Sequence, residues 1–161
     1  MHSCLKKWMW SHLRIQPRSC MQSPHPQKYL LFYSEHNIGA VITAIKGKNL
    51  SDKIPKHIEY FYVPVVDHES CNISVFFKDS FEFIEEERKR TNVLVHCMAG
   101  VSRSVTLVIA YIMQKSGAPF QIAYEYVKSK RPIVNRYLSS RSTRMRPLSS
   151  NCFNIKKDSN Q

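Results

Sequence analysis

The chain has 161 residues, of which 43% are hydrophobic and 22% are charged, and these values predict a single globular domain. Its formal net charge is +12, but residues 35–135 carry thirteen basic and eleven acidic side chains, so most of the excess lies in two flanks. Basic flanks are more typical of solvated or interaction tails than of a specific nucleic-acid groove. The longest apolar run, residues 105–113, is too short to span a bilayer.

The first half of the chain passes from a basic tail into two strands and a helix. Residues 1–27 lack clear periodicity and end in the breaker sequence Ser-Pro-His-Pro, so we expect a tail there. The runs IGAVITAI at 38–45 and EYFYVPVV at 59–66 predict strands. Residues 73–90 repeat apolar side chains at helical spacing, which predicts a helix.

The second half continues the alternation of strands and helices. Residues 93–95 (VLV) predict a buried strand, and apolar helices are predicted at 104–115, ending near Gly117, and at 120–130. Strands that alternate with helices favour an α/β fold with helices packed on a sheet. Residues 136–161 are basic and rich in serine, and we expect them to be disordered.

The cysteines indicate a reducing environment. Their number is odd and none forms a CxxC pair, which argues against a disulfide scaffold or a structural zinc site. We therefore expect a cytoplasmic or nuclear protein without a metal or another cofactor. The five are Cys4, Cys20, Cys71, Cys97 and Cys152.

The stretch VLVHCMAGVSRS, residues 93–104, predicts a phosphate-binding loop. It runs from a strand through a tight turn into a helix, so backbone N–H groups and the positive end of the helix dipole converge on one point. Gly100 permits the turn, and Arg103 offers a planar fork for two phosphate oxygens. The expected substrate-binding residues are Met98, Ala99, Gly100, Val101, Ser102 and Arg103.

The same loop favours a reactive thiolate at Cys97. The field of the loop should lower the pKa of this thiol, and a thiolate is a strong nucleophile towards phosphorus. Ser104 can donate a hydrogen bond to Cys97 when the thiolate must leave. His96 is expected to fix the loop through a hydrogen bond rather than to act as a base.

The motif H-C-x-x-G-x-x-R-S resembles the signature of the cysteine-based protein phosphatases, and most closely that of the small, atypical dual-specificity phosphatases. The resemblance covers residues 37–135. It implies a protein-tyrosine-phosphatase-like α/β fold with a central twisted mixed sheet flanked by helices. It also implies hydrolysis of phosphotyrosine and phosphoserine/threonine through a cysteinyl-phosphate intermediate, without metal.

A proton donor is needed to expel the leaving oxygen, and Asp67 is the candidate. It follows the predicted strand at 59–66, where the resembling family places a catalytic Asp. Glu69 is a close rival, and the plainer alternative is that Asp67 only caps a turn. Cys71 follows the same loop, and a passive thiol is a better expectation for it than a redox partner of Cys97.

The ends of the chain depart from the family pattern. The family begins with a strand and a short helix, of which Tyr29 to Tyr33 could be the tail, and it continues after Asn135 into a last helix that this sequence does not match. The expected organisation is therefore a basic tail at 1–27, a partly truncated catalytic domain at 28–135 and a basic Ser-rich tail at 136–161.

Other functions stay open on the same loop. An RNA 5′-triphosphatase and a phosphoinositide phosphatase use the same chemistry, and a catalytically impaired phosphate-binding or scaffold isoform would use only its binding. The expected partner is a phosphoprotein, with a protein kinase as one form of it. Residues 5–15 also suit a calmodulin-type partner or an organellar targeting segment.

Overall fold

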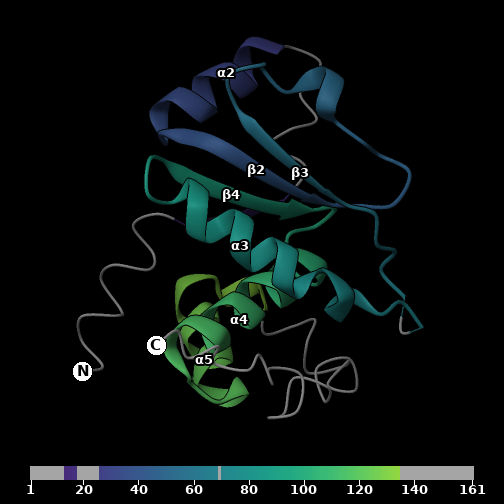
Figure 1. Cartoon of the computed structure of the whole chain (residues 1–161), viewed down its shortest axis with the longest axis vertical. Helices are drawn as coiled ribbons and strands as arrows, with labels where there is room; N and C mark the ends of the chain where they lie inside the picture. Colours follow the sequence, from purple (N-terminus) through teal and green to yellow (C-terminus); the bar gives the residue numbers. More distant parts are fainter. Residues whose placement is uncertain (1–12, 18–25, 69, 135–161) are drawn as a thin grey trace, which may run out of the picture.

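A four-stranded sheet with the order β1-β4-β2-β3 forms the centre of the fold (Figure 1). The computed structural model describes residues 13–17, 26–68 and 70–134. The strands are β1 (Leu13–Pro17), β2 (Ile38–Ala44), β3 (Glu59–Val63) and β4 (Asn92–Cys97). The α-helices are α2 (Pro26–Glu35), α3 (Phe77–Glu87), α4 (Arg103–Ser116) and α5 (Phe120–Lys130), and the short 3-10 helices are η2 (Ser51–Lys53), η3 (Ile73–Phe76) and η4 (Pro132–Val134).

The predicted strands are all present, with shifted ends. β3 stops at Val63, three residues earlier than expected, because Pro64 has no N–H to continue the ladder. β4 is longer than expected and lies between β1 and β2, where its apolar run is buried on both faces.

The strands of the described residues pair only in parallel, which corrects the expectation of a mixed sheet. Successive strands are joined by crossover connections that return the chain in the same direction. One example runs from β3 through α3 to β4, which lies on the other side of β2. The α/β fold with helices flanking a central sheet is confirmed. Its parallel order has a consequence for function, because the loops that follow β2, β3 and β4 leave the sheet at one edge.

The helices cover both faces of the sheet. In Figure 1, α2 lies above the sheet, and α3, α4 and α5 lie below it. On the lower side, Ile42 and Val95 join the main core with α4, whereas Val41 and Leu94 face the smaller cluster with Tyr33 of α2. β2 and β4 therefore send alternate side chains into two cores, which fixes their register against slippage by one residue.

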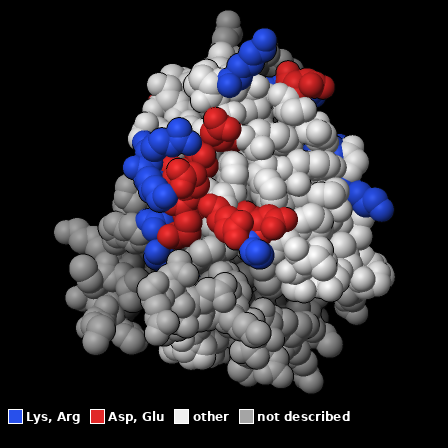
Figure 2. Space-filling model, viewed as in Figure 1, with Lys and Arg blue, Asp and Glu red and all other residues white. Residues whose placement is uncertain are grey.

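Helices α3 and α4 differ in their surroundings. Every side chain of α4 from Arg103 to Met113 is buried, and the helix ends at Ser116 with Gly117 as its C-cap, close to the expected end. The predicted helix at 73–90 is divided into η3 and α3, and α3 carries a strongly charged outer face. Figure 2 shows acidic side chains gathered over α3, with basic side chains beside them at one end.

Two elements lie partly or wholly within the expected N-terminal tail. The backbone of Leu13–Pro17 pairs with β4 from Leu13 opposite Val93 to Pro17 opposite Cys97, and Pro26–Glu35 form α2. Tyr29 to Tyr33, expected as the tail of a helix, lie inside α2. Residues 1–12, 18–25 and 135–161 lie outside the described residues, and the domain boundaries stay a prediction.

Candidate active site

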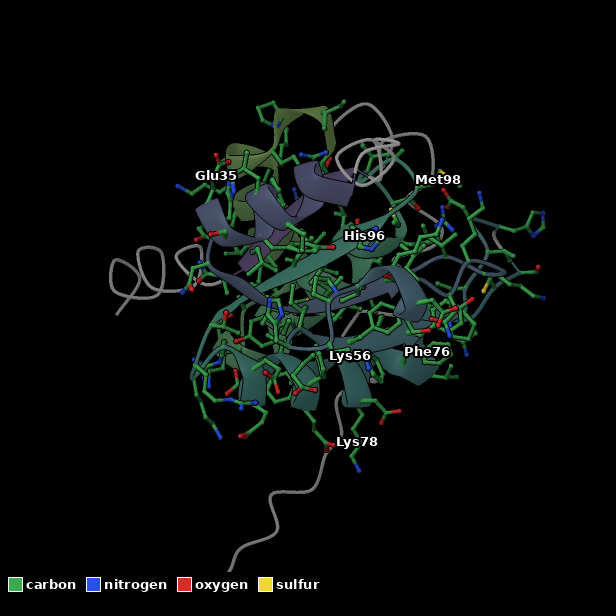
Figure 3. All side chains as sticks on the ribbon, turned by 90° about the horizontal axis from the view of Figure 1, so that it is seen from above. Glu35, Lys56, Phe76, Lys78, His96 and Met98 are labelled. Atoms are coloured by element: carbon green, nitrogen blue, oxygen red, sulfur yellow. The ribbon has the colours of Figure 1, made fainter. Side chains whose placement is uncertain are left out.

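The loop between β4 and α4 carries the predicted nucleophile and the predicted phosphate ligand at its two ends. Cys97 is the last residue of β4 and Arg103 is the first residue of α4, so rigid elements hold both. Both side chains are buried, with relative exposures of 1% and 8%. Met98 and Ala99 are exposed between them, and Figure 3 shows Met98 nearer the outside of the molecule than the buried His96.

The surroundings of Cys97 favour its thiolate. Burial raises the pKa of the thiol, but hydrogen bonds from the side chain and backbone of Ser104, the charge of Arg103 and the backbone of Gly100 together lower that pKa below its ordinary value. The Cys97 sulfur lies 3.2 Å from the Ser104 hydroxyl oxygen. Gly100 adopts φ 66°, in the left-handed region where glycine carries no steric penalty, as the tight turn requires.

Arg103 is held in place by two groups from the loop that follows β3. Its Nη1 donates a hydrogen bond to the Val65 carbonyl over 3.2 Å, and its Nε lies 4.0 Å from Oδ2 of Asp67. Nε is buried and has no hydrogen-bond partner among the described residues. A buried guanidinium N–H of this kind is a donor suited to an oxygen of a bound phosphate.

Asp67 contacts the predicted phosphate-binding loop directly, and a residue that protonates the leaving oxygen must lie close to that loop. Its Oδ1 accepts a hydrogen bond of 2.9 Å from the Ser102 hydroxyl, and its side chain is about one-quarter exposed. The structure thus places Arg103 beside both Asp67 and Cys97, and the roles expected of the three residues stay a prediction. The rival acid, Glu69, lies outside the described residues.

His96 is fully buried beneath the loop and is fixed from the neighbouring strand. Its Nε2 lies 2.6 Å from the Thr43 hydroxyl oxygen, and Thr43 is itself buried in β2. The expectation that His96 fixes the loop through a hydrogen bond stays a prediction, because this contact is with β2 and not with the loop. The partner, Thr43, was not expected; the signal for it is a hydroxyl side chain inside the apolar run IGAVITAI.

A second residue that the sequence analysis missed touches the loop from outside. Arg131, directly after α5, donates a hydrogen bond from Nε to the Gly100 carbonyl over 3.0 Å. It lies 31 residues from Gly100 in the chain, and nothing in the local sequence marks it as a loop contact. Cys71 is a half-buried free thiol packed against the main core, and the expectation that it is passive stays a prediction.

Comparison with known proteins shows the family. Residues 22–142 match the family model described as dual specificity phosphatase, catalytic domain. The chain therefore belongs to the dual specificity phosphatase family.

Relatives among curated proteins agree with this assignment. The chain is 43% identical over 94 residues to human dual specificity protein phosphatase 7, covering 54% of this chain and 22% of that protein. It is 40% identical over 101 residues to dual specificity protein phosphatase 1 of Arabidopsis thaliana, covering 62% and 50%. The chain thus spans between about one-fifth and one-half of the length of these relatives.

Solved structures share the fold over most of their length. The crystal structure of DUSP15 has a TM-score of 0.67 at 26% identity, with 83% of this chain and 88% of that chain covered. The human tyrosine phosphatase-like serine/threonine/tyrosine-interacting protein has a TM-score of 0.64 at 30% identity, with 75% and 80% covered. Within the described residues, no helix is long and apolar enough to cross a membrane.

Proposed function

We propose that the chain is a protein phosphatase that hydrolyses phosphotyrosine and phosphoserine/threonine in phosphoproteins through a cysteinyl-phosphate intermediate. The observation that carries this proposal is the Cys97 thiol, whose pKa is lowered beside Ser104 and Arg103 at the mouth of the loop. A thiolate in that position is a nucleophile held next to the loop that binds the phosphate group.

In the first step, the Cys97 thiolate attacks phosphorus, a sulfur–phosphorus bond forms and the bond from phosphorus to the leaving oxygen breaks. Asp67 gives its proton to that oxygen, so that a neutral phenol or alcohol departs. Arg103 and the backbone N–H groups of the loop stabilise the charge that develops on the other phosphate oxygens.

In the second step, water attacks the cysteinyl phosphate and the sulfur–phosphorus bond breaks. The carboxylate of Asp67 accepts the proton of the water, which returns the acid to its starting form and releases inorganic phosphate. The Ser104 hydroxyl, 3.2 Å from the sulfur, stabilises the departing thiolate with a hydrogen bond.

The alternatives are weaker on particular residues. A phosphoinositide carries further phosphates, yet the loop positions Met98, Ala99, Val101 and Ser102 hold no charge that would meet them. A second alternative is that the protein binds phosphate groups without hydrolysing them. The name of one structural relative, tyrosine phosphatase-like serine/threonine/tyrosine-interacting protein, suggests this role. Here the complete set of Cys97, Arg103 and Asp67 supports turnover. We further propose a cytoplasmic or nuclear site of action, with a phosphorylated protein kinase as one candidate substrate.

The decisive experiment is an assay of the full chain on matched phosphotyrosine and phosphothreonine peptides, beside Cys97→Ser. We expect phosphate release from both peptides by the wild-type chain and from neither by the variant. The variant should still bind a phosphate analogue, because the loop and Arg103 remain. Turnover by Cys97→Ser near the wild-type rate would exclude Cys97 as the nucleophile.

A further inference from the structure

Arg131 connects the end of α5 to the phosphate loop. Its side chain donates from Nε to the Gly100 carbonyl, with 3.0 Å between nitrogen and oxygen. Its backbone N–H donates to the Val127 carbonyl over 2.9 Å, which ties the residue to the last turn of the helix. Val127 and Val134 are fully buried on either side of it, so this hydrogen bond reaches the loop from a fixed point.

The Gly100 carbonyl belongs to the same peptide unit as the Val101 N–H. In a trans peptide, the carbonyl and the following N–H point in opposite directions. A carbonyl held outward by Arg131 therefore turns the Val101 N–H towards the inside of the loop. Gly100 has φ 66° and no side chain, so sterics alone leave this peptide unit several orientations.

We propose that Arg131 is a positioning residue. Its hydrogen bond to the Gly100 carbonyl sets the orientation of the peptide between Gly100 and Val101, so that the Val101 N–H joins the other backbone N–H groups that bind phosphate. This inference rests on the proposed phosphatase function. A phosphate dianion would be repelled by a carbonyl dipole that turned inward and attracted by the N–H that replaces it. Arg131 thus acts on the substrate through the loop.

Arg103 and Arg131 contact the same loop region from different sides. Arg103 begins α4 and its Nε is a buried donor at the site, whereas Arg131 follows α5 and holds the loop from outside. Helices α4 and α5 pack against each other, and the core residues Ala123 and Val127 of α5 are fully buried. The packing of these helices therefore fixes the distance between the inner and the outer contact.

Replacements of Arg131 can separate its hydrogen bond from its charge. Gln carries an N–H group on the same side-chain carbon as the Nε of Arg but has no charge. Met has a similar length with neither donor nor charge, and Lys keeps the charge with its donor one bond farther out. Lys130→Gln, which removes an exposed charge one residue away, is the matched control.

The test is tungstate binding by calorimetry, with every variant placed in a Cys97→Ser background so that turnover plays no part. We expect Arg131→Met to weaken tungstate binding about tenfold, the effect of one hydrogen bond to a charged group. Arg131→Gln should bind within about threefold of the parent, because the donor is kept, and Lys130→Gln should bind as the parent does.

Several results would overturn the proposal. Parent-like binding by Arg131→Met would mean that the loop needs no outer anchor. Weak binding by Arg131→Gln beside tight binding by Arg131→Lys would mean that the charge acts directly. If Arg131→Met does not fold, Arg131→Gln decides alone: tight binding supports the proposal and weak binding refutes it. Absence of phosphopeptide hydrolysis by the wild-type chain would refute the proposed function and leave this anion-binding result to stand by itself.

Discussion

At the scale of single residues, Ser104 controls how readily Cys97 ionises. Its side chain and backbone both lower the pKa of the thiol, against the effect of burial, which raises it. We expect Ser104→Ala to shift the ionisation of Cys97 to higher pH. The rate of alkylation of Cys97 by iodoacetamide, followed by peptide mass spectrometry across a pH series, measures this shift. Cys71 in the same samples is the internal reference, and an unchanged Cys97 profile would refute the assignment.

Asp67 should matter most for substrates whose leaving group needs a proton. Phenyl phosphate has a poor leaving group, whereas an aryl phosphate with a strongly acidic phenol departs without help. We expect Asp67→Asn to slow the first substrate about 10²–10⁴-fold and the second far less. The measurement is kcat on both substrates at one pH. Equal slowing of the two would point to Glu69 or another group as the acid and would leave Cys97 as the nucleophile.

The sequence predicts the site residues that carry reactive or charged groups, and it misses the residues that contact them only through the fold. Cys97, Arg103 and Asp67 each carry a reactive or charged group at a position that the loop motif or the strand end marks. Thr43 and Arg131 act through hydrogen bonds to His96 and Gly100 from elements far away in the chain. Such contacts depend on how strands and helices pack, and no local pattern records them.

At the scale of elements, Glu85 joins α3 to α4. Its carboxylate accepts hydrogen bonds from Arg88, the residue that follows α3, and from Tyr111 and Lys115 on α4, at distances of 2.6–2.7 Å. Burial raises the pKa of Glu85, but these bonds outweigh it and lower the pKa to about 2. Because the pKa is depressed on folding, the stabilisation is complete above pH 4.5 and is lost as the pH falls towards about 2.

We therefore expect Glu85→Gln to lower the free energy of unfolding at pH 7 by about 1–3 kcal/mol, since a charged hub of hydrogen bonds is weakened. Urea unfolding at pH 7 and at a pH near 2 measures the effect, and the difference from wild type should shrink at the lower pH. Glu86→Gln is the control, because Glu86 is exposed and pairs only with Lys89 among the described residues. Equal effects of both variants would contradict a special role for Glu85.

The elements themselves show where sequence patterns succeed. β4 and α4 are predictable because each contains a continuous run of apolar residues in the sequence. The structure buries these runs on all sides. β1 was missed because Leu13–Pro17 is short, lies at the edge of the described sheet and belongs to a basic segment. Its first four residues, LRIQ, do alternate between apolar and polar side chains. The parallel pairing of β1 with β4 joins residues about 80 positions apart, and only the fold reveals it.

At the scale of the whole molecule, the parallel sheet explains how the site is assembled. The carboxyl ends of β3 and β4 lie at one edge, so the loop carrying Asp67 meets the loop carrying Ser102. The helices α4 and α5 then hold that edge through Arg103 and Arg131. The chemistry therefore depends on the packing of the complete domain, although its reactive groups lie within 37 residues of sequence, from Asp67 to Arg103.

Trapping the phosphoenzyme would test the role of Cys97 directly. The full chain is mixed with a phosphotyrosine peptide, quenched with acid within one turnover and digested, and the phosphorylated peptide is identified by mass spectrometry. We expect phosphate on the sulfur of Cys97 in the wild-type chain and no phosphopeptide from Cys97→Ser. Phosphate on Ser102 or Ser104, or rapid hydrolysis with no covalent intermediate, would contradict it.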